Sequence, residues 1–381
     1  MRKLTRLMVG AVTMAAAAAL VAGSVTAASA DPIGKTGKAV VPASYDIVGV
    51  GSDTTTYVFD QFAVNYNKTV KVHNAAHPFL YSWDALPKGA SEPNKAFKIT
   101  PKAGCTSIGR PDGSGAGLKT LDMNQLDRKT GHYCVDFGRS SSGRSTGTPT
   151  SGPDGVLYVT LAKDAITWAA RSPKAGGTDA PATLNTAQLK SIFTCKVNNW
   201  SQVGGKPGAI KVYLPQAGSG TLSTWEKFMG IVPNGPVGSC VSQAPEENEG
   251  TYSGFNTKNA IAIYSIGAYV AQKYHEAACG GAKPTAKQNE FGCNLTGVLA
   301  LGDISGKAPI IANKTNTNFP SSYFRTIYDI VRDVSPKGKA AAMAPALRPI
   351  FSRTGYLCSA AARPTIADYG FIPTPLCGSF S

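Results

Sequence analysis

The sequence predicts an α/β fold with a mainly parallel sheet. Segments with strand character alternate with segments of helical periodicity through most of the 381 residues. Three glycine- and hydroxyl-rich turns, at residues 51–55, 110–117 and 217–221, each lie between a strand and a helix. In open α/β sheets such strand ends converge on a ligand crevice, so we expect the three turns to meet.

The chain opens with a segment typical of an exported protein. A basic start precedes a short, alanine-rich apolar run, and Ala28-Ser-Ala30 stands just before Asp31. This pattern indicates a signal peptide over residues 1–30, cleaved after Ala30. No cysteine lies near the cut for a lipid anchor, and no later stretch is apolar and long enough to span a bilayer. We therefore expect a secreted, extracellular protein of about 350 residues, enough for two domains.

The first two strand–turn–helix units fall in the first third of the chain. Residues 45–50 indicate a strand, and Phe59, Phe62, Ala63 and Tyr66 form the core-facing stripe of a helix. A second helix is expected over residues 118–126. A strand at 133–137 then leads to a third polar turn at 138–144, which carries two arginines.

The middle of the chain supplies further alternating elements. Residues 157–161 and 165–170 indicate two strands, and Asn185 is expected to cap a helix that runs to residue 193. A buried strand at 212–214 precedes the turn at 217–221, where we expect Thr221 to be the helix N-cap.

The last third continues the alternation less regularly. The segment Glu246-Glu-Asn-Glu249 is most simply a solvated loop. The elements expected after it are strands at 260–264, 298–301, 310–311 and 324–331 and helices at 266–274 and 340–346.

Eight cysteines in an exported chain, none of them spaced as C-x-x-C, indicate disulfides rather than zinc. Sequence does not determine their connectivity. Sequential pairing keeps each bridge within one segment, so the expected pairs are Cys105–Cys134, Cys195–Cys240, Cys279–Cys293 and Cys358–Cys377.

The charge favours anionic partners. The full chain carries 38 − 23 = +15, and removing Arg2, Lys3 and Arg6 leaves +12. Small oxyanions, wall polymers and lipid headgroups all fit this balance, while dispersed charge that serves only solubility is an equal alternative. The basic clusters are only pairs, so no nucleic-acid stripe is expected.

The turn at 217–221 has the chemistry of an anion cradle. Unpaired backbone N–H groups at a glycine-rich helix start, backed by the positive end of the helix dipole, bind anions. A plain helix start is the simpler alternative for this turn taken alone. Catalytic signals are weaker: no G-x-S-x-G, P-loop or dinucleotide fingerprint is present, and the four histidines fit surface or loop positions.

Six segments, taken in order, resemble a known family. They are residues 46–55 (DIVGVGSDTT), 113–119 (GSGAGLK), 135–141 (VDFGRSS), 189–200 (LKSIFTCKVNNW), 218–221 (GSGT) and 260–264 (AIAIY). The set is similar to the periplasmic phosphate-binding proteins of the phosphate-specific ABC transporter, especially the actinobacterial branch. This resemblance covers most of residues 45–350. It implies a type II periplasmic-binding-protein fold with two lobes, each a central sheet flanked by helices, joined by hinge strands around a phosphate.

The resemblance also implies the ligand residues. Carried over by position, with the neighbouring turn residues included, they are Ser52, Asp53, Thr54, Ser114, Arg139, Ser140, Ser141, Gly218, Ser219, Gly220 and Thr221. No metal, cofactor or catalytic residue is implied.

The chain departs from the family pattern at three positions. Ser141 stands where the family has an acid that accepts a proton from phosphate, and Asp53 stands where it has a hydroxyl. We hypothesise that the two roles are exchanged; the alternative is that Asp53 only caps its helix. Pro215 replaces the family's arginine, and either Arg139 or Arg144 could supply that charge.

We therefore expect a non-enzymatic, monomeric solute-binding protein for phosphate or a related tetrahedral anion, with an ABC transporter permease as a possible partner. Residues 31–164 and 298–381 would form lobe 1, and residues 165–297 lobe 2. Two alternatives stay open. One is a secreted phosphoester hydrolase that uses the same turns, and the other is a cationic protein associated with the cell wall.

Overall fold

The structure is a computed structural model that describes residues 31–90, 97–123, 131–145, 155–232, 238–278, 289–336 and 339–381. The expected signal peptide lies outside these ranges. In the described part of the chain, no helix combines the length and the apolar character that crossing a membrane requires.

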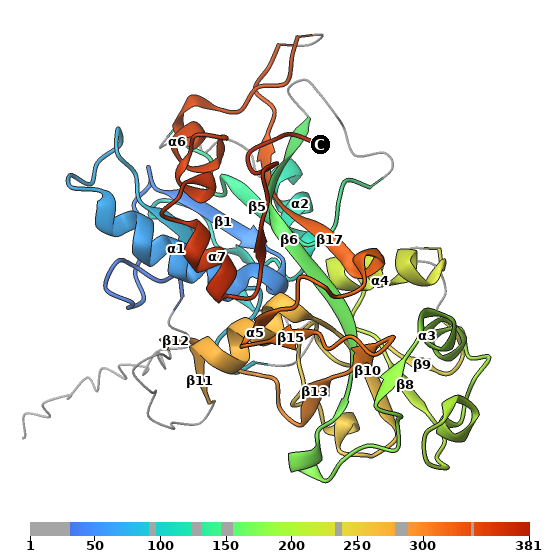
Figure 1. Ribbon diagram of the computed structural model, residues 1–381. Helices are drawn as coiled ribbons and strands as arrows, with labels where there is room; N and C mark the ends of the chain where they lie inside the picture. The colour runs from blue at the N-terminus through green and yellow to red at the C-terminus, as the bar shows by residue number, and fades with distance from the viewer. Residues whose placement is uncertain are drawn as a thin grey trace, which may run out of the picture.

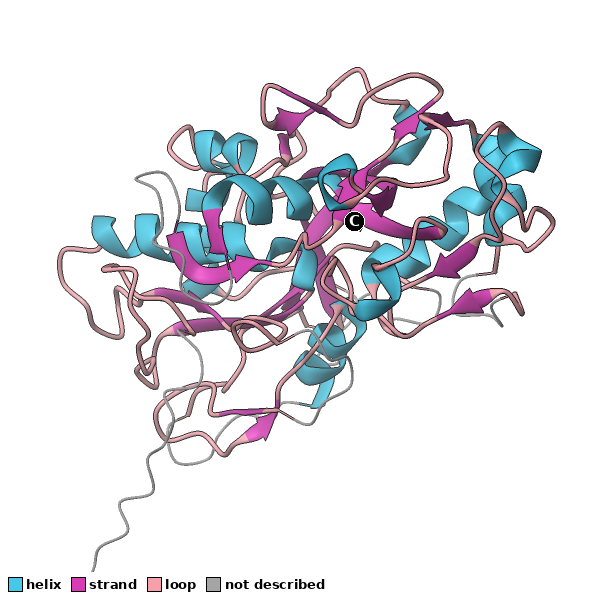
Figure 2. Cartoon of the chain, turned by 90° about the horizontal axis from the view of Figure 1, so that it is seen from below, coloured by secondary structure: helices cyan, strands magenta, loops and turns pink. Residues whose placement is uncertain are grey.

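In the part of the chain that the structure describes, seven α-helices lie around one large sheet. Figures 1 and 2 show this arrangement. The helices are α1 (Thr56–Thr69), α2 (Ser114–Met123), α3 (Thr186–Phe193), α4 (Gly220–Met229), α5 (Ile266–His275), α6 (Arg348–Phe351) and α7 (Arg363–Asp368). The strands of the large sheet are β1 (Ile47–Gly51), β2 (Leu80–Ser82), β5 (Phe137–Ser140), β6 (Val156–Arg171), β8 (Lys211–Tyr213), β9 (Val241–Ser242), β10 (Ala260–Ser265), β13 (Leu299–Leu301), β17 (Phe324–Arg332) and β18 (Ile372–Pro373). Four two-stranded pairs complete the described strands: β3 (Lys98–Ile99) with β4 (Ile108–Gly109), β7 (Thr183–Leu184) with β14 (Asp303–Ile304), β11 (Glu276–Ala278) with β12 (Asn289–Asn294), and β15 (Ile310–Ile311) with β16 (Lys314–Thr315).

The large sheet is mixed, so the expectation of a mainly parallel sheet is wrong. Its order is β2-β1-β5-β17-β6-β10-β8-β9, with β13 and β18 also paired to β6. The outer pairs β1–β2, β1–β5, β8–β10 and β8–β9 are parallel. Every pairing of β6 and β17 is antiparallel. Parallel strands with crossover helices therefore build each end of the sheet, and antiparallel strands join the two ends.

A single strand, β6, replaces the two strands expected at 157–161 and 165–170. It continues through Ala162–Asp164, and its 16 residues are almost all buried. The first part of β6 pairs with β17, and the last part pairs with β10 and β13. In Figure 1 it runs as one long green strand from the group of β1, β5 and α2 to the group of β8 and β10.

Two separate hydrophobic clusters lie at the two ends of β6. The first contains Phe59, Phe62 and Phe137 with the apolar face of α6 and α7. The second contains Trp200 and Trp225 with the apolar faces of α3 and α4. The stripe predicted for α1 is confirmed, since Phe59, Phe62 and Ala63 are buried.

Residues just after 298 pack with the second cluster. Ile304, Phe319 and Tyr323 are members of it, and Phe324 packs against it. The expected lobe 1 includes all of residues 298–381, and this boundary stays a prediction. From the packing of residues 304–323, we propose that the chain returns to lobe 1 at β17. The reason is that β17 begins beside the second cluster and ends beside the first.

Three expected disulfides are confirmed: Cys105–Cys134, Cys195–Cys240 and Cys358–Cys377. Cys293 is also disulfide-bonded, but Cys279, its expected partner, lies outside the described residues. The helix expected at 340–346 is wrong. An isolated bridge joins Asp333 to Met343, and helical structure begins only at Pro345, where proline fits the first turn.

Candidate functional site

Hydroxyl groups from three distant turns meet at one place. Ser52 Oγ, at the end of β1, donates to Ser141 Oγ at 3.0 Å. Ser114 Oγ, at the start of α2, lies 3.2 Å from the same Ser141 oxygen and accepts from Ser141 N at 3.0 Å. All three serines are buried. Parallel pairing of β1 with β5 brings the ends of these two strands together, as expected for an open α/β sheet.

The turn before α4 comes from the other end of the sheet and closes against these serines. Gly115 N donates to Gly218 O at 3.3 Å. A Cβ added at Gly220 would clash with both Ser114 Oγ and Ser141 Oγ. The helix N-cap is Ser219, whose Oγ accepts from Leu222 N at 3.0 Å, so the expectation that Thr221 is the cap is wrong. Thr221 lies inside the first helical turn, so its hydroxyl does not cap the helix and points into the site instead.

Two threonine hydroxyls from opposite ends of the sheet share one carboxylate oxygen. Thr54 Oγ1 donates to Glu247 Oε1 at 2.7 Å, and Thr221 Oγ1 donates to the same atom at 2.6 Å. The two hydroxyls are 3.3 Å apart. All three side chains are buried, so this is a dry junction between the two clusters.

Arg325 supplies the positive charge of the junction. Its Nη2 donates to Thr221 Oγ1 at 2.9 Å and lies 3.3 Å from Thr54 Oγ1. Asp164 pairs with the same guanidinium at 2.8 Å, from the middle of β6. Arg325 was missed in the sequence. Two signals were available in the sequence. Arg325 is the only arginine in the strand-like run 324–331, and Asp164 stands between the strand-like segments 157–161 and 165–170.

The segment 246–249 is buried, which corrects the expectation of a solvated loop. Each of its four side chains is at most 3% exposed. Asn248 anchors the segment: its Nδ2 donates to Asp53 Oδ2 at 3.0 Å, and its Oδ1 accepts from Ser265 N at 2.9 Å. The composition of the segment did not predict its burial, because charge-rich segments are usually solvated unless tertiary contacts provide partners for their charges.

Carboxyl groups crowd this side of the junction. Burial raises the pKa of Asp53 well above its usual value, and the nearby Glu247 carboxylate raises it further. Burial also raises the pKa of Glu246 to about 10 and that of Asp112 to about 6. These shifts favour neutral carboxyls. The exchange of roles between Asp53 and Ser141 stays a prediction. A capping role for Asp53 is not supported, because Asp53 lies within the helical turn that Ser52 precedes.

Arg139 does not face the junction, contrary to expectation. Its five N–H donors contact Ser52 O, Gly51 O, Trp83 O and the hydroxyls of Ser82 and Thr56. The guanidinium is fully buried beneath the turn that carries Ser52. It therefore braces that turn and has no N–H left for a ligand. Arg144 donates to Val156 O at 2.7 Å and stacks on Tyr158.

A polar cavity of about 430 Å³ opens beside the serines. Ser114 and Ser219 line it together with Ser140, Arg144 and Lys227. Ser140 Oγ itself donates to Ser142 O at 2.8 Å. The residues that line this cavity come from both ends of the sheet.

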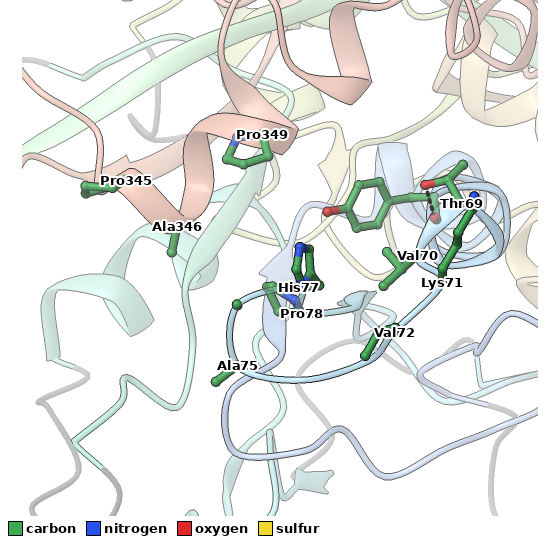
Figure 3. Close-up of a pocket in the computed structure, with 12 residues that line it drawn as sticks. Thr69, Val70, Lys71, Val72, Ala75, His77, Pro78, Pro345, Ala346 and Pro349 are labelled. Atoms are coloured by element: carbon green, nitrogen blue, oxygen red, sulfur yellow. Dashed lines mark hydrogen bonds between the residues drawn. The ribbon is translucent and has the colours of Figure 1, made fainter.

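A second cavity, of about 670 Å³, lies elsewhere (Figure 3). Its wall is mainly apolar and combines Val70, Val72 and Pro78 with Pro345 and Pro349. None of the predicted ligand residues lines it. The serine and threonine junction is therefore the better candidate for an anion.

Comparison with known proteins identifies the family of this fold. The model of the PBP superfamily domain, the periplasmic-binding-protein class, matches residues 42–344. The chain belongs to the PBP superfamily. The predicted fold family is thus confirmed for most of the chain.

Two solved structures resemble this PBP-superfamily protein. A putative phosphate ABC transporter substrate-binding protein with bound phosphate from Clostridium perfringens is 15% identical, with a TM-score of 0.50, and the match covers 86% of this chain and 99% of that one. An ABC-type phosphate transport receptor from Vibrio cholerae is 18% identical, with a TM-score of 0.49 and the same coverage. At this identity, the Clostridium perfringens match supports the fold alone.

Proposed function

We propose that this protein captures inorganic phosphate, or a closely related tetrahedral oxyanion, between two lobes for phosphate uptake or scavenging. One observation carries the proposal: donors from both ends of the sheet converge on a buried junction with a guanidinium beside it. Thr54, Ser52 and Ser114 come from one end, and the turn 218–221 comes from the other. Several oriented N–H and O–H dipoles and one guanidinium hold a dehydrated oxyanion well.

The two lobes would close on the ligand by hinge motion of β6 and β17, which connect the two hydrophobic clusters. The Clostridium perfringens protein that shares this fold has phosphate bound. We further propose that Arg325 takes the role that the sequence suggested for Arg139 or Arg144, because its guanidinium reaches both threonines. Export, a monomeric state and delivery to an ABC transporter permease are parts of the same proposal.

Calorimetry with phosphate, sulfate and a chromogenic phosphate ester tests this function. We expect saturable 1:1 phosphate binding, weaker sulfate binding and no release of the chromophore. A thermal shift that rises with the logarithm of phosphate concentration would agree with it. Ester turnover would instead favour a hydrolase. Salt-sensitive binding to polyanions without a saturable small ligand would favour a wall-associated protein.

A further inference from the structure

The Glu247 carboxylate lies where an oxyanion would be held. Its Oε1 accepts the hydroxyl protons of Thr54 and Thr221, one from each end of the sheet. A carboxylate and a phosphate demand the same donors, namely O–H groups backed by a guanidinium. We propose that Glu247 is an internal competitor of the oxyanion, whose carboxylate must leave the two threonine hydroxyls before phosphate can use them. The proposal rests on the proposed phosphate-binding function.

Besides Glu246 Oε2 and Asp112 Oδ1, two buried atoms of charged side chains at the junction have no hydrogen-bond partner. They are Glu247 Oε2 and Arg325 Nη1, from side chains that are respectively 1% and 7% exposed as residues. Buried charged groups are normally fully satisfied, so an unsatisfied anion and cation at one site indicate an arrangement that a ligand changes. An incoming oxyanion can accept from Arg325 Nη1, which would relieve one of the two atoms.

The charges around the junction do not favour a second anion while Glu247 stays. Arg325 is already paired with Asp164. Among the described residues, the acids Asp53, Asp112 and Glu246 lie near Glu247, and their raised pKa values show that burial here disfavours further negative charge. Phosphate beside an ionised Glu247 would thus meet like charge in a dry site, which is strongly unfavourable. Exchange of one anion for the other avoids this repulsion.

The hydrogen bonds of Asn248 favour movement of the Glu247 side chain over movement of the loop that carries it. Next to Glu247, Asn248 O accepts from Gln272 Nε2 at 2.9 Å, and Asn248 Oδ1 accepts from Ser265 N at 2.9 Å. Because Asn248 is held on both sides, rotation of the Glu247 side chain is the simplest way to release the threonines.

The alternative is that Glu247 receives a hydrogen bond from the protonated ligand. The two roles predict opposite effects of Glu247→Gln, which keeps the size of the side chain and removes its charge. An internal competitor predicts tighter phosphate binding, by tenfold or more in Kd measured by calorimetry. A proton acceptor predicts weaker binding. The matched control is Glu249→Gln. This residue is similarly buried in the same segment, but its carboxylate accepts from Thr251 and Tyr252 and has no hydrogen bond to Thr54 or Thr221.

Phosphate binding by Glu247→Gln that is at least tenfold tighter than that of the wild type and the control supports the proposal. Unchanged or weaker binding overturns it while leaving the proposed function intact. A second measurement separates the two ideas: small-angle scattering of phosphate-free Glu247→Ala should show a larger radius of gyration, because the junction between the lobes is lost. If that expansion occurs but no variant binds phosphate, the proposed function fails, and the competitor role fails with it. Melting curves of each variant exclude misfolding as the cause.

Discussion

The side-chain oxygens of Thr54 and Thr221 lie 3.3 Å apart, although 167 positions separate them in the sequence. One follows β1, and the other lies in the first turn of α4. Each packs with a different end of the large sheet. Their meeting defines the junction between the two ends of the sheet.

The Thr221 hydroxyl is expected to donate to the ligand. Thr221→Val keeps the shape and removes the donor, so phosphate binding should weaken by about 1–3 kcal/mol, or roughly 5- to 150-fold in Kd. Calorimetry measures the loss. Thr224→Val is the control on the same helix, because Thr224 Oγ1 donates only to Gly220 O, at 2.8 Å, and its affinity should stay within about twofold of the wild type. Equal affinities for all three proteins would move the ligand away from Thr221.

Gly220 is expected to be necessary for closure. A methyl group there would meet Ser114 Oγ and Ser141 Oγ, so Gly220→Ala should hold the two lobes apart and weaken phosphate binding at least tenfold. Scattering should report a larger radius of gyration than for the wild type. At Gly109 a Cβ would find nothing within 4 Å, so Gly109→Ala should change neither quantity. A compact, tightly binding Gly220→Ala protein would contradict the closed arrangement.

The Asp164–Arg325 pair should contribute strongly to folding. Both residues are buried, and Asp164→Asn leaves the guanidinium without its counter-charge, so unfolding free energy should fall by about 3 kcal/mol in urea titrations. The surface pair Lys314–Asp368 has the same 2.8 Å separation, but its side chains are about half exposed. Lys314→Met should therefore cost less than about 1 kcal/mol. Similar losses for the two variants would show that burial does not decide the strength of these pairs.

Asp112 should make stability depend on pH. Burial raises its folded-state pKa to about 6, above the ordinary value of 3.8. The unfolded chain then releases this proton first as pH rises, so the contribution to stability is complete below about pH 4 and is lost by pH 6 to 7. Asp112→Asn should be more stable than the wild type at pH 8, by about 1–2 kcal/mol, and show no gain at pH 3.5. Urea titrations at both pH values measure this. A gain that is the same at both values would exclude titration as its cause.

The local elements were largely predictable because they depend on local periodicity and capping. The apolar spacing on α1 and the Asn185 capping box on α3 are both seen in the structure. Sequential cysteine pairing was confirmed for the three bridges that lie wholly within the described residues. The continuous strand β6 was missed, because neighbouring apolar segments look alike whether or not a turn separates them.

The sequence by itself determined the α/β class, the three polar turns and the family resemblance, since these depend on residue order and short-range pattern. Only the tertiary structure decided which charges serve the site. Arg139 donates to backbone oxygens under its own turn. Arg325, by contrast, lies on β17, which pairs with β6, and donates to Thr54 and Thr221. The acids of 246–249 are likewise buried by distant partners. A side chain's solvation depends on what the fold places against it, and sequence position alone does not contain that information.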